Sequence, residues 1–374
     1  MKSPKVLLTG AEWYGDLLAF CERGLLEIGA EVRVIATNRF DWSESAVRHR
    51  QRLGRMPIVG AKVEWHLQQK HKQRLVAEVR QQVVKTVKEW QPDLILSILC
   101  WNEPITENLL SDLAGIPVIK AAWLMDDPFQ HDGNLAALSV GYDLVYAIDG
   151  SWIEPLRLLT KSPVTELLCG VDLQSQHSVS PAAIPAKFRC GVAFVGSSYR
   201  GNIVGKMRNR LLQQVADLGL HIYGDQGWAS ECADLAQCYR GGELSSNEAN
   251  LAYNGADIAL NIHHPQFRVG TSLRTFAICG AGAFQLVDWR PGLDRFLIPN
   301  EEIVAYRTPD ELRELSLYYL ADAEARRRIA RAGYERVRHE HTYAHRLAQM
   351  LRDADLLPSI AKINTSQVIV KAHL

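Results

Sequence analysis

The sequence lacks several features that would place it in a common functional class. Its seven cysteines include no CxxC pair, and their odd number and scattered spacing fit neither a disulfide framework nor a zinc site. No apolar run approaches the ~20 residues that a membrane-spanning helix needs. The opening residues MKSPKVLLTG are too short for a signal-peptide core. We therefore expect reduced thiols, no integral membrane segment and a cytoplasmic location.

An excess of charge of one sign is also missing. The 42 basic residues balance the 42 acidic residues, so no net field attracts the chain to nucleic acid or to an anionic membrane. GxSxG, HRD and Walker A motifs are absent from the sequence, which argues against hydrolase, kinase and P-loop classes. We expect no nucleic-acid partner.

What is present is enough for two domains, because 374 residues exceed the ~100–200 of a usual single domain. Short apolar runs alternate with helical patterns in both halves, which predicts parallel sheets with right-handed crossovers. The predicted strands cover 5–9, 31–36, 93–99 and 143–147, and then 192–195, 221–223, 258–262 and 283–287.

Helix signals add detail to this pattern. A stripe of apolar residues predicts a helix within 67–90, formed by Leu75, Val79, Val83, Val87 and Trp90. The Arg-rich stretch 38–60 is expected to be a long loop. Thr308 is expected to cap a helix that begins at Pro309.

The domain boundaries follow from composition. We expect an N-terminal Rossmann-like domain over 1–173 and a C-terminal one over 189–340. Residues 174–188 form the expected linker, since this stretch is rich in Ser, Pro and Ala and has no periodicity. A C-terminal helix and tail complete the chain at 341–374.

Ligands of doubly wound sheets bind beyond the carboxyl ends of the strands. The first such loop, Gly10–Gly15, is not GxGxxG, and the second strand ends without an acidic residue, which disfavours a dinucleotide dehydrogenase. A later strand ends in the pair Asp126 and Asp127. This pair is either a functional acid pair or only turn chemistry.

The second half has the better anion site. Small residues near a helix start let backbone N–H groups converge on a phosphate, and arginines add positive charge. The candidates are Gly196, Ser197, Ser198, Arg200, Asn261, His263, Thr271, Ser272, Arg274 and Thr275. Tyr223 and Gly224, at another strand end, are expected to meet the nucleotide base. His263 and His264 are adjacent and face opposite ways on a strand, so we expect no metal site there.

Motifs spread over nearly the whole chain resemble the CgeB-type glycosyltransferases, which are related to the group 1 retaining glycosyltransferases. They include WLMDDP at 123–128, GVD at 170–172, VAFVG at 192–196, LNIH at 260–263 and RTF at 274–276. The resemblance implies an α/β fold of two Rossmann-like domains facing a cleft (GT-B), with C-terminal helices packing back toward the N-terminal domain. It also implies metal-independent donor binding in the C-terminal domain and an acceptor site in the N-terminal domain.

One position departs from the family. Relatives usually have Glu after RTF, whereas this chain has Ala277, and the second family Glu falls on Val269. That carboxylate is thought to hold the ribose of the donor, and losing such a hydrogen bond costs roughly ten- to a hundred-fold in affinity.

The function we expect is transfer of a sugar from a nucleotide-diphosphate donor, of UDP or dTDP type, to a hydroxyl or amine. The acceptor is a small molecule, a glycan or a peptide, and no further cofactor is expected. Asp126 is the candidate for orienting or deprotonating the acceptor, with His131 and Glu12 behind it. A degenerate GT-B protein with a binding or scaffold role and a nucleotide-sugar epimerase remain alternatives.

Overall fold

The computed structural model describes residues 3–11, 16–37, 57–100, 105–130, 132–199 and 202–357. These residues fall into two compact units. The first takes in the residues up to Ile148, then Trp152–Leu167 and those from Leu347 onward, and the second takes in Asp149–Ser151 and Leu168–Arg346. Each unit is built on its own sheet.

The first unit contains a six-stranded parallel sheet in the order β2-β1-β3-β4-β5-β6. Its strands are β1 (Lys5–Gly10), β2 (Glu31–Ala36), β3 (Leu94–Leu99), β4 (Ile119–Leu124), β5 (Leu144–Ala147) and β6 (Val164–Glu166). The central strand β3 is buried along its whole length, as its uninterrupted apolar run predicts for a parallel sheet covered on both faces.

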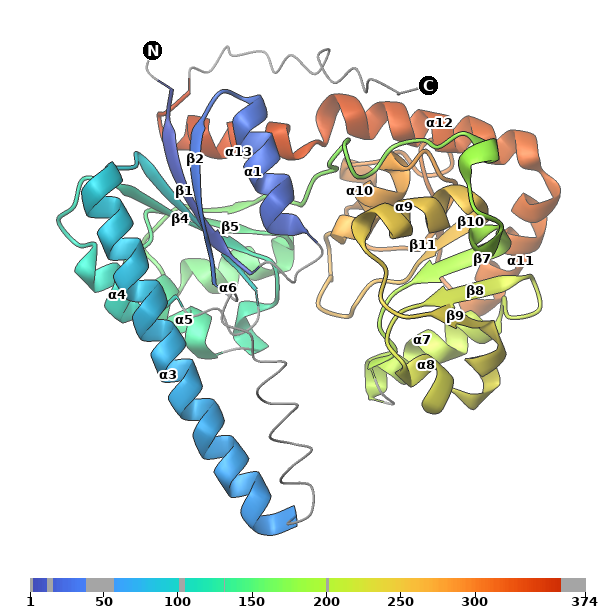
Figure 1. Ribbon diagram of the computed structural model, residues 1–374. Helices are drawn as coiled ribbons and strands as arrows, with labels where there is room; N and C mark the ends of the chain where they lie inside the picture. Colours follow the sequence, from blue (N-terminus) through green and yellow to red (C-terminus); the bar gives the residue numbers. More distant parts are fainter. Residues whose placement is uncertain are drawn as a thin grey trace. The chain divides into compact units, whose positions relative to one another are not determined.

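The helices of this unit are α1 (Leu17–Glu27), α3 (Pro57–Trp90), α4 (Glu107–Asp112), α5 (Asp132–Val140) and α6 (Ile153–Arg157). Right-handed crossovers place α1 on one face of the sheet and α3, α4 and α5 on the other (Figure 1). The last helix, α13 (Tyr343–Asp353), ends in this unit, where Asp353 accepts a hydrogen bond of 2.9 Å from the Tyr146 hydroxyl.

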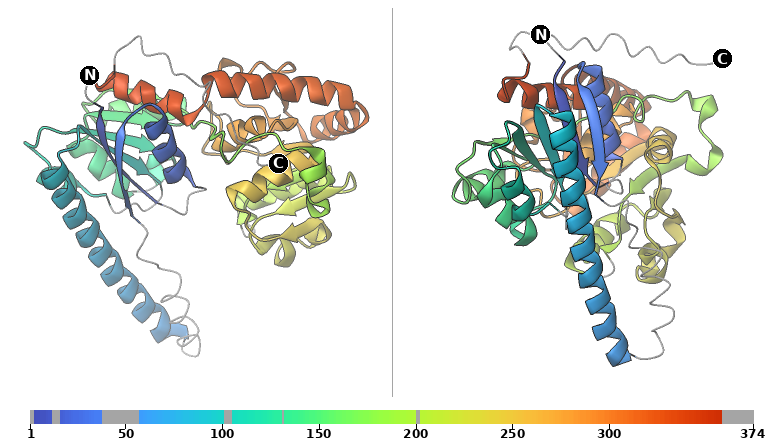
Figure 2. Two further views of the ribbon diagram at one scale, coloured as in Figure 1. Left: turned by 45° about the horizontal axis from the view of Figure 1, so that its top comes forward. Right: turned by 60° about the vertical axis from the view of Figure 1, so that its left-hand side comes forward.

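Helix α3 is longer than the sequence predicted. Its buried stripe of Leu75, Val79, Val83 and Val87 is confirmed. The helix begins already at Pro57, so residues 57–60 are helical and not part of a loop, and its first half extends beyond the sheet (Figure 2). The rest of the predicted Arg-rich loop, 38–56, lies outside the described residues.

The second unit repeats the architecture with the strand order β12-β11-β10-β7-β8-β9. Its strands are β7 (Cys190–Val195), β8 (Leu220–Tyr223), β9 (Tyr239–Gly241), β10 (Ala256–Asn261), β11 (Gln285–Asp288) and β12 (Val304–Tyr306). Its helices are α7 (Ile203–Gln213), α8 (Gly227–Ser230), α9 (Ser246–Gly255), α10 (Leu273–Gly280), α11 (Pro309–Ala321) and α12 (Ala323–Glu340). Two parallel six-stranded sheets therefore confirm the predicted α/β fold.

The predicted linker packs onto the second unit. The His177 and Val179 backbone N–H groups donate to the side-chain oxygens of Asn250 and Asn254, at 3.2 and 2.8 Å. Both asparagines lie on α9, so this helix holds the segment in place.

Helix caps follow the sequence closely. Thr308 caps α11 through a 3.1 Å hydrogen bond from the Glu311 backbone N–H to its hydroxyl, and Pro309 occupies the first helical position. The Thr308 hydroxyl pairs with a backbone N–H group that has no partner inside the helix. Pro309 has no N–H group, and none is needed at the first helical position.

Replacing Thr308 with Ala should lower the free energy of unfolding by about 1 kcal/mol, because the capping hydrogen bond is lost. Thr308→Ser should restore most of it. Ser180→Ala is the matched control, since Ser180 precedes a short 3-10 helix without making a side-chain cap. Urea denaturation measures all three variants, and equal midpoints for Thr308→Ala and Ser180→Ala would contradict the assignment.

Candidate functional site

Polar side chains collect at the carboxyl ends of β7, β8, β10 and β11 in the second unit, where open α/β sheets bind ligands. Three loops contribute: the turn after β7, the turn after β8 and the segment between β10 and α10. Most of the residues selected from the sequence lie on these loops, although Arg200 lies outside the described residues.

The turn after β7 directs its donors at a carboxylate of the chain itself. Asp225, which follows β8, accepts hydrogen bonds from the Ser197 hydroxyl at 2.6 Å, the Ser198 hydroxyl at 2.5 Å and the Ser198 backbone N–H at 2.8 Å. The sequence suggested that these donors meet the diphosphate of a ligand, whereas in the structure they meet Asp225, which was not foreseen. Binding of a diphosphate by Gly196, Ser197 and Ser198 stays a prediction.

These hydrogen bonds determine the ionisation of Asp225. Burial raises its pKa, but the donors on Ser197, Ser198 and Gly227 outweigh burial and lower the pKa to about 2. Asp225 is therefore ionised at neutral pH and stabilises the turn in its charged form.

The turn also needs close backbone contact with the end of β8. A Cβ on Gly224 would lie 2.2 Å from the Gly196 carbonyl oxygen, so only glycine fits there. The same oxygen accepts a 2.8 Å hydrogen bond from the Trp228 indole. Tyr223 is buried and its hydroxyl donates to the Lys187 carbonyl, while burial raises its pKa to about 12. Contact of Tyr223 and Gly224 with a nucleotide base stays a prediction.

Arg208 is a site residue that sequence reasoning missed. It lies on α7 and is only 2 % exposed, and its guanidinium donates to the carbonyl oxygens of Ser197 at 2.9 Å and Ile262 at 3.1 Å. It also lies 4.7 Å from the centre of the Tyr199 ring. The burial of Arg208 could have been predicted from the sequence, because Arg208 lies four residues from both Val204 and Leu212 and therefore on the same buried face of α7.

Two arginines lie close together at this edge. Burial, followed by the positive charge of Arg274, lowers the pKa of Arg208 to about 10. Arg274 is half-buried on the first turn of α10 and interacts with the Tyr253 hydroxyl. Neither arginine makes an ion pair with a carboxylate in the described part of the chain. Two like charges without such a partner favour an anionic ligand.

A buried histidine organises the segment between β10 and α10. His263 follows β10 and is fully buried. Its Nδ1 lies 2.7 Å from a carboxylate oxygen of Asp288, and its Nε2 lies 2.8 Å from the Thr271 hydroxyl. Nδ1 donates to the carboxylate, and Nε2 forms the second hydrogen bond of the ring, with the Thr271 hydroxyl. Burial raises the pKa of Asp288, but His263 and Arg290 outweigh burial and lower it.

The network continues into the sheet. The Thr271 and Thr275 hydroxyl oxygens lie 2.5 Å apart, and the Asn261 amide donates to Thr275 at 2.9 Å and to Gln285 at 3.0 Å. All of these side chains are buried. Asn261, Thr271 and Thr275 are therefore brought together as the sequence suggested. Their hydrogen bonds connect the end of β10 to the start of α10.

Asp149 holds the same segment from another direction. One of its carboxylate oxygens accepts the backbone N–H groups of Arg268, Val269 and Gly270 at 2.8, 3.1 and 2.9 Å. Asp149 is fully buried and was not singled out from the sequence. Three N–H groups on one oxygen form a strong anchor for a loop.

The start of α10 offers unused polar groups. Ser272 is the N-cap residue but makes no capping bond, and its hydroxyl is buried without a hydrogen-bond partner in the described structure. The Asn261 side-chain oxygen is in the same state. Ala277, one turn further along α10, is buried and brings no carboxylate.

The catalytic candidates of the first unit are only partly described. Asp126 follows β4 and is half-buried. Its neighbour Asp127 is buried and caps a short 3-10 helix by accepting from the Phe129 backbone N–H at 3.0 Å and the Gln130 amide at 3.2 Å. Asp127 therefore stabilises the local turn, as expected for turn chemistry. His131 and Glu12 lie outside the described residues.

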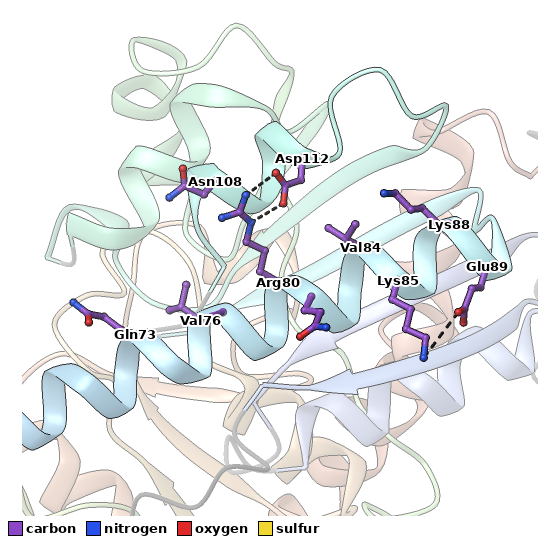
Figure 3. Close-up of a pocket in the computed structure, with 11 residues that line it drawn as sticks. Gln73, Val76, Arg80, Val84, Lys85, Lys88, Glu89, Asn108 and Asp112 are labelled. Carbon is purple, nitrogen blue, oxygen red and sulfur yellow. Dashed lines mark hydrogen bonds and ion pairs between the residues drawn. The ribbon is translucent and has the colours of Figure 1, made fainter.

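A separate groove of about 700 Å³ lies on the first unit, between α3 and α4 (Figure 3). Arg80 and Asp112 form a two-pronged ion pair across it, with both contacts at 2.6 Å. This groove lies on the outer helices and not at the strand ends. Across the described residues, no three potential metal ligands of the His, Cys, Asp and Glu types come together. No helix in the described part of the chain could span a membrane.

Asp225 supplies a test by pH. Its pKa in the folded protein is about 2, below the ~3.9 of an unfolded chain, so it contributes stability above pH ~4 that is lost as the pH falls toward 2. Asp225→Asn should therefore lower the free energy of unfolding at pH 7 by about 1–2 kcal/mol.

The difference from wild type should shrink steadily between pH 4 and pH 2. The exposed Asp294, for which the structure shows no ion pair, provides the control variant Asp294→Asn. Thermal unfolding over this pH range measures the effect, and a difference that does not depend on pH would refute the assignment.

Comparison with known proteins finds a family match over much of the second unit. Residues 207–352 match the family described as glycosyl transferase-like. The spore protein CgeB of Bacillus subtilis (strain 168) is 24 % identical over 281 residues, which cover 67 % of this chain and 78 % of CgeB.

Solved structures support the fold. A sucrose-phosphate synthase from Thermosynechococcus elongatus superposes with a TM-score of 0.63 at 14 % identity, covering 94 % of this chain and 99 % of the other. The Anabaena protein HepE, solved in complex with UDP, superposes with a TM-score of 0.60 at 14 % identity, covering 94 % and 100 %. Together these findings confirm the GT-B fold and the resemblance to CgeB-type proteins, and residues 207–352 are glycosyl transferase-like.

Proposed function

We propose that the chain transfers a sugar from a UDP- or dTDP-type nucleotide-diphosphate sugar to a hydroxyl or amine of a small molecule, a glycan or a peptide. One observation carries the proposal. Arg208 on α7 is close enough to Arg274, on the first turn of α10, for the charge of Arg274 to lower its pKa, and neither arginine forms an ion pair with a carboxylate in the described structure.

A diphosphate matches this arrangement in charge and in hydrogen bonding. The N-terminus of α10 adds backbone N–H groups and a partial positive charge. The partnerless Ser272 hydroxyl at the same place supplies a further donor. The match of residues 207–352 to the glycosyl transferase-like family covers Arg208, Ser272 and Arg274, and HepE was solved with UDP.

The ribose would have to be held differently from other members of the family. Ala277 supplies no carboxylate for its hydroxyls, and Val269 supplies none either. The Asn261 side-chain oxygen, buried without a hydrogen-bond partner in the described residues, is an unused acceptor on the adjoining strand end. We expect donor affinity to be weaker by roughly ten- to a hundred-fold than with a ribose-binding glutamate.

In the proposed reaction, the bond between the anomeric carbon and the phosphate oxygen breaks and a bond to the acceptor oxygen or nitrogen forms. Arg208 and Arg274 stabilise the negative charge that develops on the leaving diphosphate. Their two positive charges supply what a divalent cation would otherwise supply, so we propose metal-independent transfer. By similarity to the related retaining enzymes, we propose retention through front-side attack, in which the acceptor proton passes to Asp126 or to the leaving phosphate.

The alternatives differ in what they need. An epimerase needs available acids and bases beside the sugar, but Asp149, Asp225 and Asp288 each accept several hydrogen bonds from the protein. Because these carboxylates are already hydrogen-bonded within the protein, they are poorly placed to exchange protons with a sugar, which disfavours the epimerase. A binding or scaffold role is favoured only by the missing carboxylate at Ala277, and it requires that no sugar be transferred.

Arg274→Gln should weaken UDP binding by at least tenfold, because a charge-assisted contact to the diphosphate is lost. Arg210→Gln on α7 is the control, since Arg210 is exposed on the same helix as Arg208. Calorimetric titration with UDP, dTDP and GDP measures the loss. Unchanged UDP affinity in Arg274→Gln would overturn the phosphate assignment, and binding without any sugar transfer would favour the scaffold role.

Asp126→Asn should lower kcat by about 10²–10⁴-fold, the usual contribution of a general base. The KM for the donor should change little, because Asp126 is assigned to the acceptor. Release of UDP from UDP-sugars in the presence of an acceptor panel measures both constants, with Asp294→Asn as the control. A raised donor KM with unchanged kcat would move Asp126 out of the catalytic role.

A further inference from the structure

A second groove lies in the second unit, on the side away from the candidate donor site. It has a volume of about 560 Å³ and runs between α12 and the amino-terminal ends of β10 and β11. Its floor is made of small residues that leave room, namely Ala256, Gly282, Ala283, Ala323 and Ala330. Helix α12 packs against α10 (Figure 1), and its residues line one side of the groove.

The wall of the groove is unusually basic. Arg326, Arg327 and Arg331 of α12 all line it, together with two acidic residues, Asp257 and Glu335. Whether the groove is positive depends on which of these charges are already paired.

Both carboxylates of the groove are engaged by other partners. Asp257 forms an ion pair with Arg326, whose guanidinium also donates to the Leu320 carbonyl at 2.9 Å. Glu335 pairs with Arg338 at 3.7 Å and with His339 at 3.6 Å. The charge of Arg326 is therefore balanced, and in this structure both acids contact basic residues other than Arg327 and Arg331.

Arg327 and Arg331 have no ion pair within the described residues. They are four positions apart on α12, so their side chains leave the same face of the helix one turn apart. Both are exposed at the groove, and their planar donors can reach one group together. Ser178 and Tyr334 line the same space, and each carries a hydroxyl group that can donate a hydrogen bond.

Two guanidinium groups with nearby hydroxyls match a phosphate group better than a carboxylate. A phosphate dianion carries more charge and more acceptor oxygens, and arginine binds it through paired N–H bonds. We propose that this groove is a second anion site, which binds a small phosphate-bearing ligand between Arg327 and Arg331.

The site is separate from the donor site. Ala256, at the groove, begins β10, and Asn261, at the donor site, ends it. Five residues of strand separate the two ends by about 16 Å. The two sites are therefore distinguishable by mutation, and the second site does not depend on the proposed transfer reaction.

The experiment is calorimetric titration of the full chain with inorganic phosphate, at constant ionic strength maintained with chloride. Wild type should bind phosphate, Arg331→Gln should bind it less tightly, and Arg327→Gln/Arg331→Gln should bind at least tenfold less tightly. Arg328→Gln is the matched control, because Arg328 is exposed on α12 but does not line the groove. Its affinity should stay within twofold of wild type.

UDP binding should be unchanged in the double variant, and thermal unfolding should show that the variant is folded. Phosphate binding that survives in the double variant but disappears in Arg274→Gln would overturn the proposal and place the phosphate in the donor site. Absence of phosphate binding by wild type at millimolar concentration would overturn it as well. Loss of UDP binding in Arg274→Gln with phosphate retained would leave both proposals standing.

Discussion

The candidate donor site depends on how the segment between β10 and α10 is anchored. Asp288 holds its beginning through His263, and Asp149 holds its middle through three backbone N–H groups. Both carboxylates accept hydrogen bonds in a buried setting, where leaving a charge unpaired would be costly. The direction of α10, and with it the positions of Ser272 and Arg274, follows from these two anchors.

Arg208 places a buried positive charge at this edge of the sheet. A buried guanidinium satisfies its N–H groups with carbonyl oxygens, which accept hydrogen bonds but carry no full negative charge. Its charge therefore remains available to a ligand. The nearby Arg274 adds a second positive charge, and the diphosphate proposed to bind there would offset the cost of holding the two charges together.

The turn after β7 shows what reasoning from sequence could not supply. Small residues at a strand end do bring donors together on an anion. The anion found is Asp225, which lies 28 residues from Ser197 in the sequence. Spacing along the chain carries no information about such a partner. Arg208, by contrast, could have been found, because its four-residue spacing from Val204 and Leu212 marks it as buried.

The sequence by itself determined the two parallel sheets, the helical stripe that ends at Val87 and the cap at Thr308, because each depends on residues close together in the chain. It also revealed the missing carboxylate at Ala277. Only the tertiary structure decided which polar groups are already used. Hydrogen bonds such as those of Asp149 and Asp225 join residues far apart in the chain, and they separate the side chains that hold the fold from those left for a ligand.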